Sequence, residues 1–147
     1  MKVKIKKLVP EAVIPTYAHF GDAAMDLTCT SVNTDEYGNI VYGTGLAFEI
    51  PKGYAMFIYL RSSNHKTSLM LTNHVGIVDS GYRGEVLLKY SPYSDVTGFI
   101  RNDEQDYKLG DRIGQAIIMP VPFITFEETD VLSDSERGTG GYGSTGR

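Results

Sequence analysis

Residues 51–60 read Pro51-Lys-Gly-Tyr-Ala-Met-Phe-Ile-Tyr-Leu60, a turn signal followed at once by an almost unbroken apolar run. Proline and glycine favour a tight turn, whereas aromatic and β-branched side chains favour a strand buried on at least one face. Residues 85–90 and 116–121 repeat this character between further turn residues. Near the start of the chain, Val3 and Ile5 alternate with lysines, which is the two-residue period of a half-buried strand. These segments predict an all-β fold.

The composition also favours short strands over long helices, because the 147 residues include sixteen glycines, six prolines and ten tyrosines. Residues 36–39 and 79–81 predict two hairpin turns, since glycine and asparagine tolerate positive φ. One short helix is predicted at residues 62–70, with one of its first two residues, both serines, as the N-cap. The polar and acidic segment 91–108 is expected to form an exposed hairpin.

Charge and cysteine content exclude several classes of protein. Fourteen Lys+Arg against eighteen Asp+Glu give a net charge of -4, which argues against general adhesion to membranes and against direct nucleic-acid binding. No apolar run approaches the roughly 20 residues of a membrane-spanning helix. Residues 1–10 show no export signal, so a cytoplasmic location is predicted. The lone Cys29 excludes an intrachain disulfide and is expected to be a small packed side chain. The length fits one domain, residues 1–147.

The C-terminal tail, residues 136–147, differs in composition from the rest of the chain. Five of the ten residues after Arg137 are glycine, whose ordering has a high entropic cost, so a flexible tail is expected. Arginine and the hydroxyls of Ser144 and Thr145 suit phosphate groups, and the ring of Tyr142 suits a nucleobase. The structural alternative is an unordered tail without a role.

Polar side chains also stand at the ends of the predicted strands. Arg61 follows an apolar run and precedes Ser62 and Ser63, which suits an anion-binding site. Gln115 begins a strand and can donate to phosphate oxygens, and Asp26 can support a magnesium ion through water. A solvated strand end, an ordinary N-cap and a structural hydrogen bond are the alternatives for these residues.

The segment 73–84 presents a carboxylate and an aromatic ring at one bend. Asp79 can act as a general base there if a metal-bound phosphate lies within hydrogen-bond reach, and Tyr82 lies three residues further on. An Asx-turn at Asp79 and surface packing of Tyr82 are the structural alternatives.

Together and in this order, these clusters closely resemble the trimeric, all-β family of deoxyuridine triphosphatases (dUTPases). The five motifs of that family correspond to Ala23–Leu27, Arg61–Ser63, Gly76–Gly84, Gly110–Gln115 and Arg137–Gly146. In the second motif, Leu60 and Ser63 stand where the family usually has proline and glycine. The resemblance runs from about Ile5 to Arg147. It implies a distorted jelly roll or β-barrel with one short helix and a flexible glycine-rich tail that acts as a lid.

The resemblance further implies hydrolysis of dUTP to dUMP and pyrophosphate, which keeps uracil out of DNA and supplies dUMP for thymidylate synthesis. Asp79 would activate water for in-line attack on the α-phosphate, and Mg²⁺ would bridge the phosphates while Asp26 holds a metal-bound water. The implied substrate-binding residues are Arg61, Ser62, Ser63, Asn73, Gly76, Val78, Tyr82, Gln115, Arg137, Tyr142, Gly143, Ser144 and Thr145. Each active site of the family takes segments from three subunits, so a homotrimer is implied too.

Two other functions compete with this one. A dCTP deaminase shares the fold and similar Arg-Ser-Ser and Asp-x-Gly-aromatic patterns, but its catalytic glutamate would fall near Lys89, and lysine cannot replace that base. A non-catalytic module that binds nucleotide or a protein partner is the second alternative. It has no need of a carboxylate at the position of Asp79.

Overall fold

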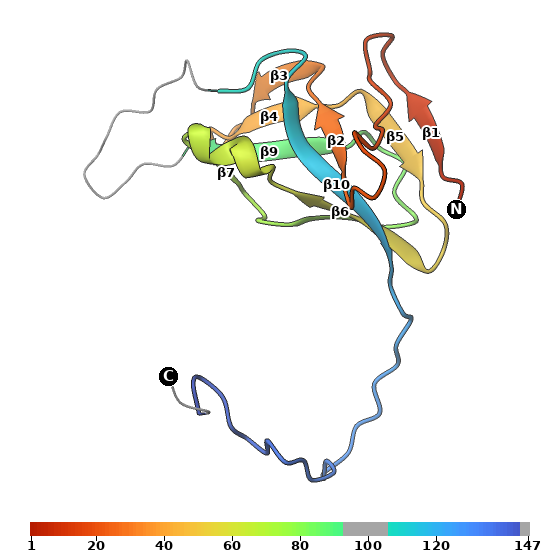
Figure 1. Cartoon of the computed structure of the whole chain (residues 1–147), viewed down its shortest axis with the longest axis vertical. Helices are drawn as coiled ribbons and strands as arrows, with labels where there is room; N and C mark the ends of the chain where they lie inside the picture. The colour runs from red at the N-terminus through yellow and green to blue at the C-terminus, as the bar shows by residue number, and fades with distance from the viewer. Residues whose placement is uncertain (93–105, 145–147) are drawn as a thin grey trace, which may run out of the picture.

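Nearly all regular structure in this computed structural model, which describes residues 1–92 and 106–144, is β-strand (Figure 1). The strands of these residues are β1 Lys4–Lys7, β2 Met25–Thr28, β3 Ser31–Thr34, β4 Ile40–Gly43, β5 Leu46–Glu49, β6 Tyr54–Tyr59, β7 Leu69–Leu71, β8 Gly76–Val78, β9 Leu87–Pro92 and β10 Arg112–Pro120. The all-β prediction is confirmed. The apolar segments 51–60, 85–90 and 116–121 supply β6, β9 and β10, although the strand ends differ by a few residues.

Two four-stranded antiparallel sheets form the body of the chain. The first has the strand order β2-β10-β6-β8 and the second has the order β3-β4-β9-β7, while β1 pairs only with β5. Both sheets combine strands that are far apart in the sequence, as Figure 1 shows for β2 beside β10. This arrangement is consistent with a jelly roll.

The core lies between the sheets and is built from alternate residues of their strands. Leu27, Tyr42, Leu46, Tyr90 and Ile113 are fully buried. Cys29 is also buried, and burial raises the pKa of its thiol. The prediction that this cysteine is a packed side chain is therefore confirmed.

Three tyrosines connect the two sheets. The rings of Tyr42 on β4, Tyr90 on β9 and Tyr107, which precedes β10, meet edge to face with centroids 5.5–5.8 Å apart. The Tyr90 hydroxyl donates to the Ile113 carbonyl on β10, and burial raises the pKa of this phenol. The cluster thus holds β10 of the first sheet against β4 and β9 of the second.

The helix predicted at residues 62–70 is wrong in type and length. Ser62–Lys66 forms a short 3₁₀-helix, η1, and Leu69–Leu71 is already the strand β7. Arg61 occupies the N-cap without a side-chain capping bond, so neither serine caps the helix. The side chains of Thr67 and Ser68, which follow η1, compete with helix formation, and burial of Leu69 and Leu71 favours the strand.

Of the two predicted hairpin turns, the one at residues 36–39 is confirmed, because β3 and β4 pair across it and Gly38 adopts φ +80°. The hairpin predicted at 79–81 is wrong. The backbone N–H of Tyr82 does donate to the Asp79 carbonyl at 3.1 Å, but the turn carries the chain from β8 in the first sheet to β9 in the second. The hairpin expected at 91–108 falls mostly on residues 93–105, outside the described residues.

A β-bulge in β10 controls which side chains share a face. The pairing of β10 with β2 shifts between Arg112 and Gly114, so that one extra residue is inserted in β10. Residues three apart on a regular strand point to opposite faces. With the extra residue, Arg112 and Gln115 point to the same side, while Ile113 and Ala116 are both buried.

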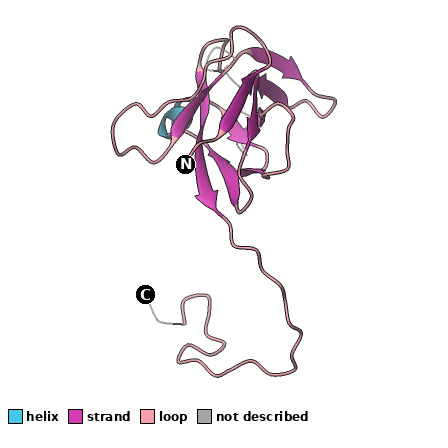
Figure 2. Cartoon of the chain, turned by 90° about the vertical axis from the view of Figure 1, so that its right-hand side faces the viewer, coloured by secondary structure: helices cyan, strands magenta, loops and turns pink. Residues whose placement is uncertain are grey.

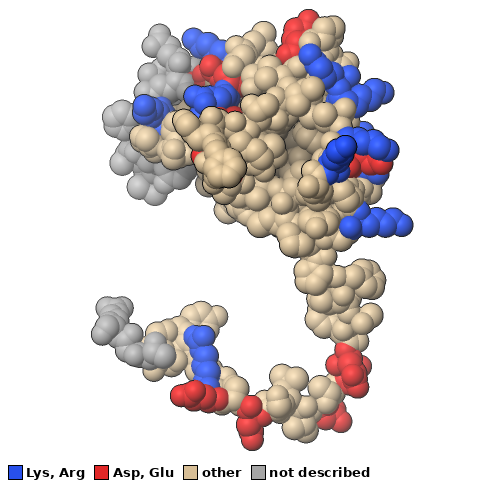
Figure 3. All heavy atoms as spheres, turned by 45° about the vertical axis from the view of Figure 1, so that its right-hand side comes forward, with Lys and Arg blue, Asp and Glu red and all other residues tan. Residues whose placement is uncertain are grey.

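After β10 the chain leaves the body as an extended segment that bends in short turns near its end (Figures 1 and 2). Phe123 and Phe126 on this segment are 98% and 93% exposed, and Tyr142 is fully exposed. Figure 3 shows mainly acidic side chains along the segment, whereas basic and acidic side chains are both visible on the body. None of the helical structure in residues 1–92 and 106–144 is both long enough and apolar enough to cross a membrane.

Candidate active site

The first candidate pocket lies over the paired strands β2 and β10. It has a volume of about 440 Å³ and is lined by Thr16, Ala18, Asp22, Ala23, Ala24, Asp26, Arg61, Arg112, Gln115 and Ile117. Asp26 and Gln115 are direct partners in the antiparallel register, so their side chains are neighbours. We call this cavity the Asp26 pocket. It brings together three predicted site residues that are distant in sequence.

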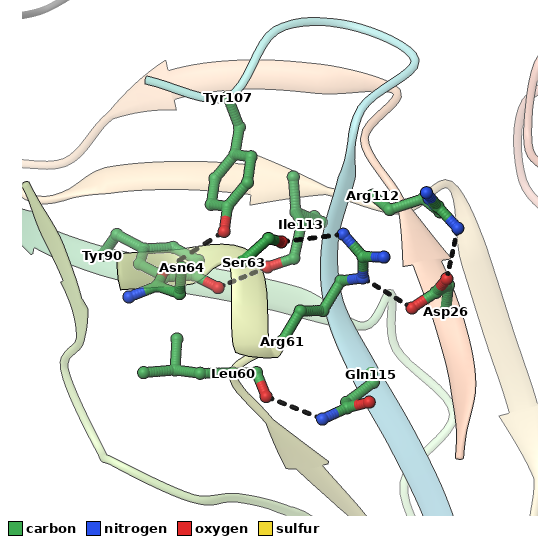
Figure 4. A network of polar contacts seen from close by, with 10 residues as sticks. All are labelled: Asp26, Leu60, Arg61, Ser63, Asn64, Tyr90, Tyr107, Arg112, Ile113 and Gln115. Atoms are coloured by element: carbon green, nitrogen blue, oxygen red, sulfur yellow. Dashed lines mark hydrogen bonds and ion pairs between the residues drawn. The ribbon is translucent and has the colours of Figure 1, made fainter. Parts of the chain in front are cut away.

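Ion pairs organise the charged side chains of the Asp26 pocket (Figure 4). Arg61 Nε donates to Asp26 Oδ1 at 2.7 Å, and Arg112 Nη1 donates to Asp26 Oδ2 at 3.0 Å. The side chains of Asp26 and Arg61 are only 27% and 20% exposed. One carboxylate therefore faces two guanidinium groups, whose remaining N–H donors are suited to phosphate.

Gln115 links the pocket to the strand end that carries Arg61. Its Nε2 donates to the Leu60 carbonyl at 2.8 Å (Figure 4). The side-chain oxygen accepts no hydrogen bond within the described parts of the chain. Gln115 therefore has the structural bond expected for an ordinary strand residue, while it still lines the Asp26 pocket.

The second candidate pocket lies beside β8, at the turn that carries the predicted general base. It has a volume of about 220 Å³ and is lined by Ile58, Asn73, Gly76, Ile77, Val78, Asp79, Tyr82, Glu85, Val86 and Leu87. We call it the Asp79 pocket. The predicted residues Asn73, Gly76, Val78, Asp79 and Tyr82 all lie together there.

Tyr82 is held at the wall of the Asp79 pocket by its hydroxyl. This hydroxyl donates to the Glu85 carbonyl at 2.9 Å. A Cβ atom added to Gly84 would lie 2.4 Å from the Tyr82 hydroxyl oxygen, so the Tyr82 ring occupies space that only a glycine at position 84 leaves open. Glu85 is fixed in turn, because its Oε1 accepts from the backbone N–H of Gly45 at 2.7 Å.

The two pockets lie at opposite edges of one sheet. Asp26 is on the edge strand β2 and Asp79 follows the other edge strand, β8, with β10 and β6 between them. The two cavities share no lining residue. A single copy of the chain therefore does not bring the predicted site residues into one cavity.

The tail residues lie in neither pocket. Arg137, Tyr142, Gly143 and Ser144 are on the segment that leaves the body (Figures 1 and 2), and Thr145 lies outside the described residues. Hydrogen bonds join Arg137 to Gly140 and Ser144 to Gly141 within the tail itself. Ser62 and Ser63 lie in η1, next to Arg61.

The Asp26 pocket fits a magnesium ion that is bound through water, but not one that is bound directly to the carboxylate. No group of three or more potential ligands is found in residues 1–92 and 106–144. Both oxygens of Asp26 already accept hydrogen bonds from arginines, so a metal bound directly to them would compete with two guanidinium groups. A metal-bound water that donates to this carboxylate is compatible with its remaining lone pairs.

Sequence reasoning missed three features of the site. It did not select Arg112, although the residue stands in the quoted segment 110–115, because the bulge that turns it toward Asp26 has no clear sequence signal. It did not foresee that Ser63 accepts a hydrogen bond from Arg61 Nη1 at 3.1 Å. It also missed the left-handed backbone of His74, φ +59°, which follows Asn73.

Lys89, the residue that bears on the deaminase alternative, has a structural partner. Lys89, which stands near the place of the deaminase glutamate, donates from Nζ to Asp35 Oδ2 at 3.1 Å. This ion pair ties β9 to the turn between β3 and β4. No residue of β9 is an aspartate or a glutamate, so β9 offers no carboxylate in place of the deaminase glutamate.

Comparisons with known proteins agree with the geometry. A family model described as dUTPase matches residues 10–146. The deoxyuridine 5'-triphosphate nucleotidohydrolase of Nautilia profundicola is 41% identical over 149 residues and is covered over 100% of both chains. The protein of the same name from Rhodococcus erythropolis is 39% identical, over 99% of this chain and 87% of its own. Among solved structures, a point mutant of the Staphylococcus bacteriophage 80alpha dUTPase with dUpNHpp has a TM-score of 0.80 at 27% identity, over 99% of each chain.

Proposed function

The chain belongs to the dUTPase family, and on that premise we propose that it hydrolyses dUTP to dUMP and pyrophosphate, which limits uracil in DNA and provides dUMP for thymidylate synthesis. The observation that carries this proposal is the Asp79 pocket, in which an exposed carboxylate stands beside Asn73 and a fixed Tyr82. Deamination is disfavoured because Lys89, which is paired with Asp35, stands near the place of the deaminase glutamate and cannot replace that base. A purely binding role is disfavoured because it needs no carboxylate at that position.

Asp79 is the proposed general base. It accepts a proton from water as the water oxygen bonds to the α-phosphorus, and the bond from that phosphorus to the bridging oxygen breaks in line. Pyrophosphate then leaves and dUMP retains the new oxygen. The exposure of Asp79 leaves its carboxylate open to a water molecule.

The nucleoside is proposed to bind in the Asp79 pocket. Asn73 and the backbone of Gly76 and Val78 would hydrogen-bond the uracil edge, and the ring of Tyr82 would lie against the deoxyribose, where a 2′-hydroxyl would clash. Asn73 and Gly76 are close together, since the side-chain nitrogen of Asn73 is 3.6 Å from the position of a Cβ on Gly76. A buried Gly76 thus keeps the pocket open at its base.

The triphosphate is proposed to bind at the Asp26 pocket and under the tail. Arg61, Ser62 and Gln115 would contact phosphate oxygens, with Ser63 at their side. The tail would close over the nucleotide through Arg137, Tyr142, Gly143, Ser144 and Thr145, with Tyr142 stacked on uracil. Its exposed ring and glycine-rich backbone suit a segment that orders on its ligand and excludes water.

Magnesium would be held by the phosphates, with Asp26 accepting a hydrogen bond from a metal-bound water. When bound, the ion would neutralise charge that develops on the phosphate oxygens. Arg61 and Arg112 orient the Asp26 carboxylate for that hydrogen bond.

A homotrimer with shared sites is the proposed assembly. The Asp26 pocket and the Asp79 pocket lie on opposite edge strands, so a second copy is needed to place one against the other. The exposed Phe123, Ile124 and Phe126 on the segment after β10 are suited to packing on a neighbouring copy. The tail extends away from the body of its own chain (Figure 2), which suits a role at the site of another subunit.

The test is pyrophosphate release with Mg²⁺ from dUTP, dCTP, dTTP and UTP by the natural chain and by Asp79→Asn. We expect release from dUTP alone, reduced by about 10²–10⁴-fold in Asp79→Asn. Binding of dUpNHpp by that variant shows that the pocket is intact. Ammonia released from dCTP would assign deamination instead, and binding of dUpNHpp without turnover by the natural chain would assign a binding module.

A further inference from the structure

The guanidinium of Arg61 is held from two sides. Asp26 Oδ1 accepts from Nε at 2.7 Å, and the hydroxyl of Ser63 accepts from Nη1 at 3.1 Å (Figure 4). Nε and Nη1 point in different directions on the planar group, so these two bonds fix both its position and its rotation. Nη2 donates to no protein group within residues 1–92 and 106–144.

The backbone that presents Ser63 is itself anchored. The N–H of Asn64 donates to the Arg61 carbonyl at 2.9 Å, which closes the turn around Ser63. The side chain of Asn64 donates to the Leu69 carbonyl at 2.9 Å and accepts from the Tyr107 hydroxyl at 3.1 Å. The Ser63 hydroxyl therefore has a fixed place relative to β7 and to the tyrosine cluster of the core.

This bond depends on a side chain that distinguishes the chain from the motif it resembles. Where that motif has glycine, there is no hydroxyl, and Arg61 would have only Asp26 to orient it. Ser62 is the more exposed of the two serines and makes no side-chain bond to Arg61 in the described structure. The two neighbouring hydroxyls thus have different environments.

We propose that Ser63 is a positioning residue that acts on the substrate's phosphates through Arg61, by holding the guanidinium so that Nη2 faces the ligand. The inference rests on the proposed function, because it takes the phosphate chain of dUTP as the ligand of Arg61. An arginine fixed before binding loses less side-chain freedom on contact with phosphate, so the affinity is higher.

A double-mutant cycle tests this role against direct contact between Ser63 and phosphate. We expect Ser63→Ala to weaken binding of dUpNHpp by about three- to tenfold, because Arg61 becomes free to rotate. In an Arg61→Gln background, Ser63→Ala should change that affinity by less than about twofold. An equal loss in both backgrounds would overturn the proposal, since Ser63 would then bind phosphate by itself.

Three controls separate positioning from a general effect on structure. Ser63→Thr keeps a hydroxyl and should retain affinity for dUpNHpp, and Ser68→Ala, at a similarly half-buried serine near the same turn, should leave it unchanged. Binding of deoxyuridine, which has no phosphate, should be the same in Ser63→Ala and in the natural chain. A matching loss for deoxyuridine would also overturn the proposal. Turnover of dUTP by the natural chain tests the proposed function separately.

Discussion

Asp26 and Arg112, on the neighbouring strands β2 and β10, are joined by an ion pair of 3.0 Å between Oδ2 and Nη1. The other oxygen of Asp26 is paired with Arg61. Arg112 therefore adds a positive charge to the Asp26 pocket and also confines the carboxylate that confines Arg61. The guanidinium groups of Arg61 and Arg112, from two separate segments, both depend on this one carboxylate.

Arg112→Gln should weaken substrate binding more than it weakens the fold. The side chain of Arg112 is 59% exposed, so its ion pair contributes about 0–1 kcal/mol to folding. We expect the KM for dUTP to rise by about three- to tenfold at low salt, because one positive charge near the phosphates is lost. Steady-state kinetics at two ionic strengths check this. Arg112→Lys, which retains the charge, should have a KM between that of the natural chain and that of Arg112→Gln. A large drop in Tm with an unchanged KM would assign Arg112 a structural role only.

Gly84→Ala should reduce discrimination against UTP. The new methyl would lie 2.4 Å from the Tyr82 hydroxyl, so the ring must move and lose its bond to the Glu85 carbonyl. We expect the ratio of kcat/KM for dUTP to that for UTP to fall by about tenfold. Gly81→Ala is the matched control, because a Cβ there meets nothing within 4 Å and should leave the ratio unchanged. An equal ratio of kcat/KM for dUTP to that for UTP in Gly84→Ala and Gly81→Ala would refute the proposed role of Tyr82 in excluding ribonucleotides.

Gly114→Ala should destabilise the core. Its Cβ would lie 2.4 Å from Leu88 Cδ2 and 3.3 Å from the Tyr59 carbonyl oxygen, and overpacking of this kind costs about 1–3 kcal/mol. Urea unfolding measures the change. The double variant Gly114→Ala/Leu88→Val shortens the neighbouring side chain. Its loss of unfolding free energy should be smaller than the sum of the losses in the two single variants. Simple additivity would show that the contact with Leu88 is not the cause.

How far sequence reasoning reaches is shown by β10. The apolar run 116–121 predicts a strand, because burial and β propensity act on consecutive residues. The bulge between Arg112 and Gly114 depends instead on how β10 packs against β2, a partner 86 residues away in the Asp26–Arg112 pair. That contact is not encoded in any local pattern, so the role of Arg112 could not be predicted.

The candidate site shows the same division. The identities of Asp79, Tyr82 and Gln115 follow from motif resemblance, and the structure places them in pockets. The turn after Asp79 was predicted from its glycine, but its connection between two sheets was not, since turn residues fix a bend and leave the destination of the next strand open. Equally, the predicted helix at 62–70 ended early because Leu69 and Leu71 gain more by burial in a strand.

Asp35 predicts one component of the pH dependence of stability. Desolvation raises the pKa of its carboxyl, but hydrogen bonds from Asn39, Lys89 and Tyr37 outweigh it and lower the pKa from 3.8 to about 2. A lowered folded-state pKa stabilises the fold above pH 3.8, and the contribution is lost as the pH falls toward 2. The difference in unfolding free energy between the natural chain and Asp35→Asn should therefore shrink over this interval.

The proposed sharing of active sites between subunits predicts complementation between inactive chains. Asp79→Asn and Arg61→Gln should each be inactive alone, but chains of the two kinds refolded together should recover about a quarter of the natural activity. Recovery requires that Asp79 and Arg61 of one site come from different copies, as their separate pockets indicate. Mixed assemblies that form, by native mass spectrometry, yet remain inactive would place both residues in the same copy.

The burial of Cys29 makes the chain a convenient background for spectroscopic probes. Cys29 is 2% exposed and the pKa of its thiol is raised, so the thiol reacts slowly with maleimides under native conditions. A cysteine introduced by Gly141→Cys, where a Cβ meets nothing within 4 Å, would be the fast-reacting thiol of the protein. A fluorophore at that point would test whether the tail closes on the nucleotide, as proposed, without prior removal of the native cysteine.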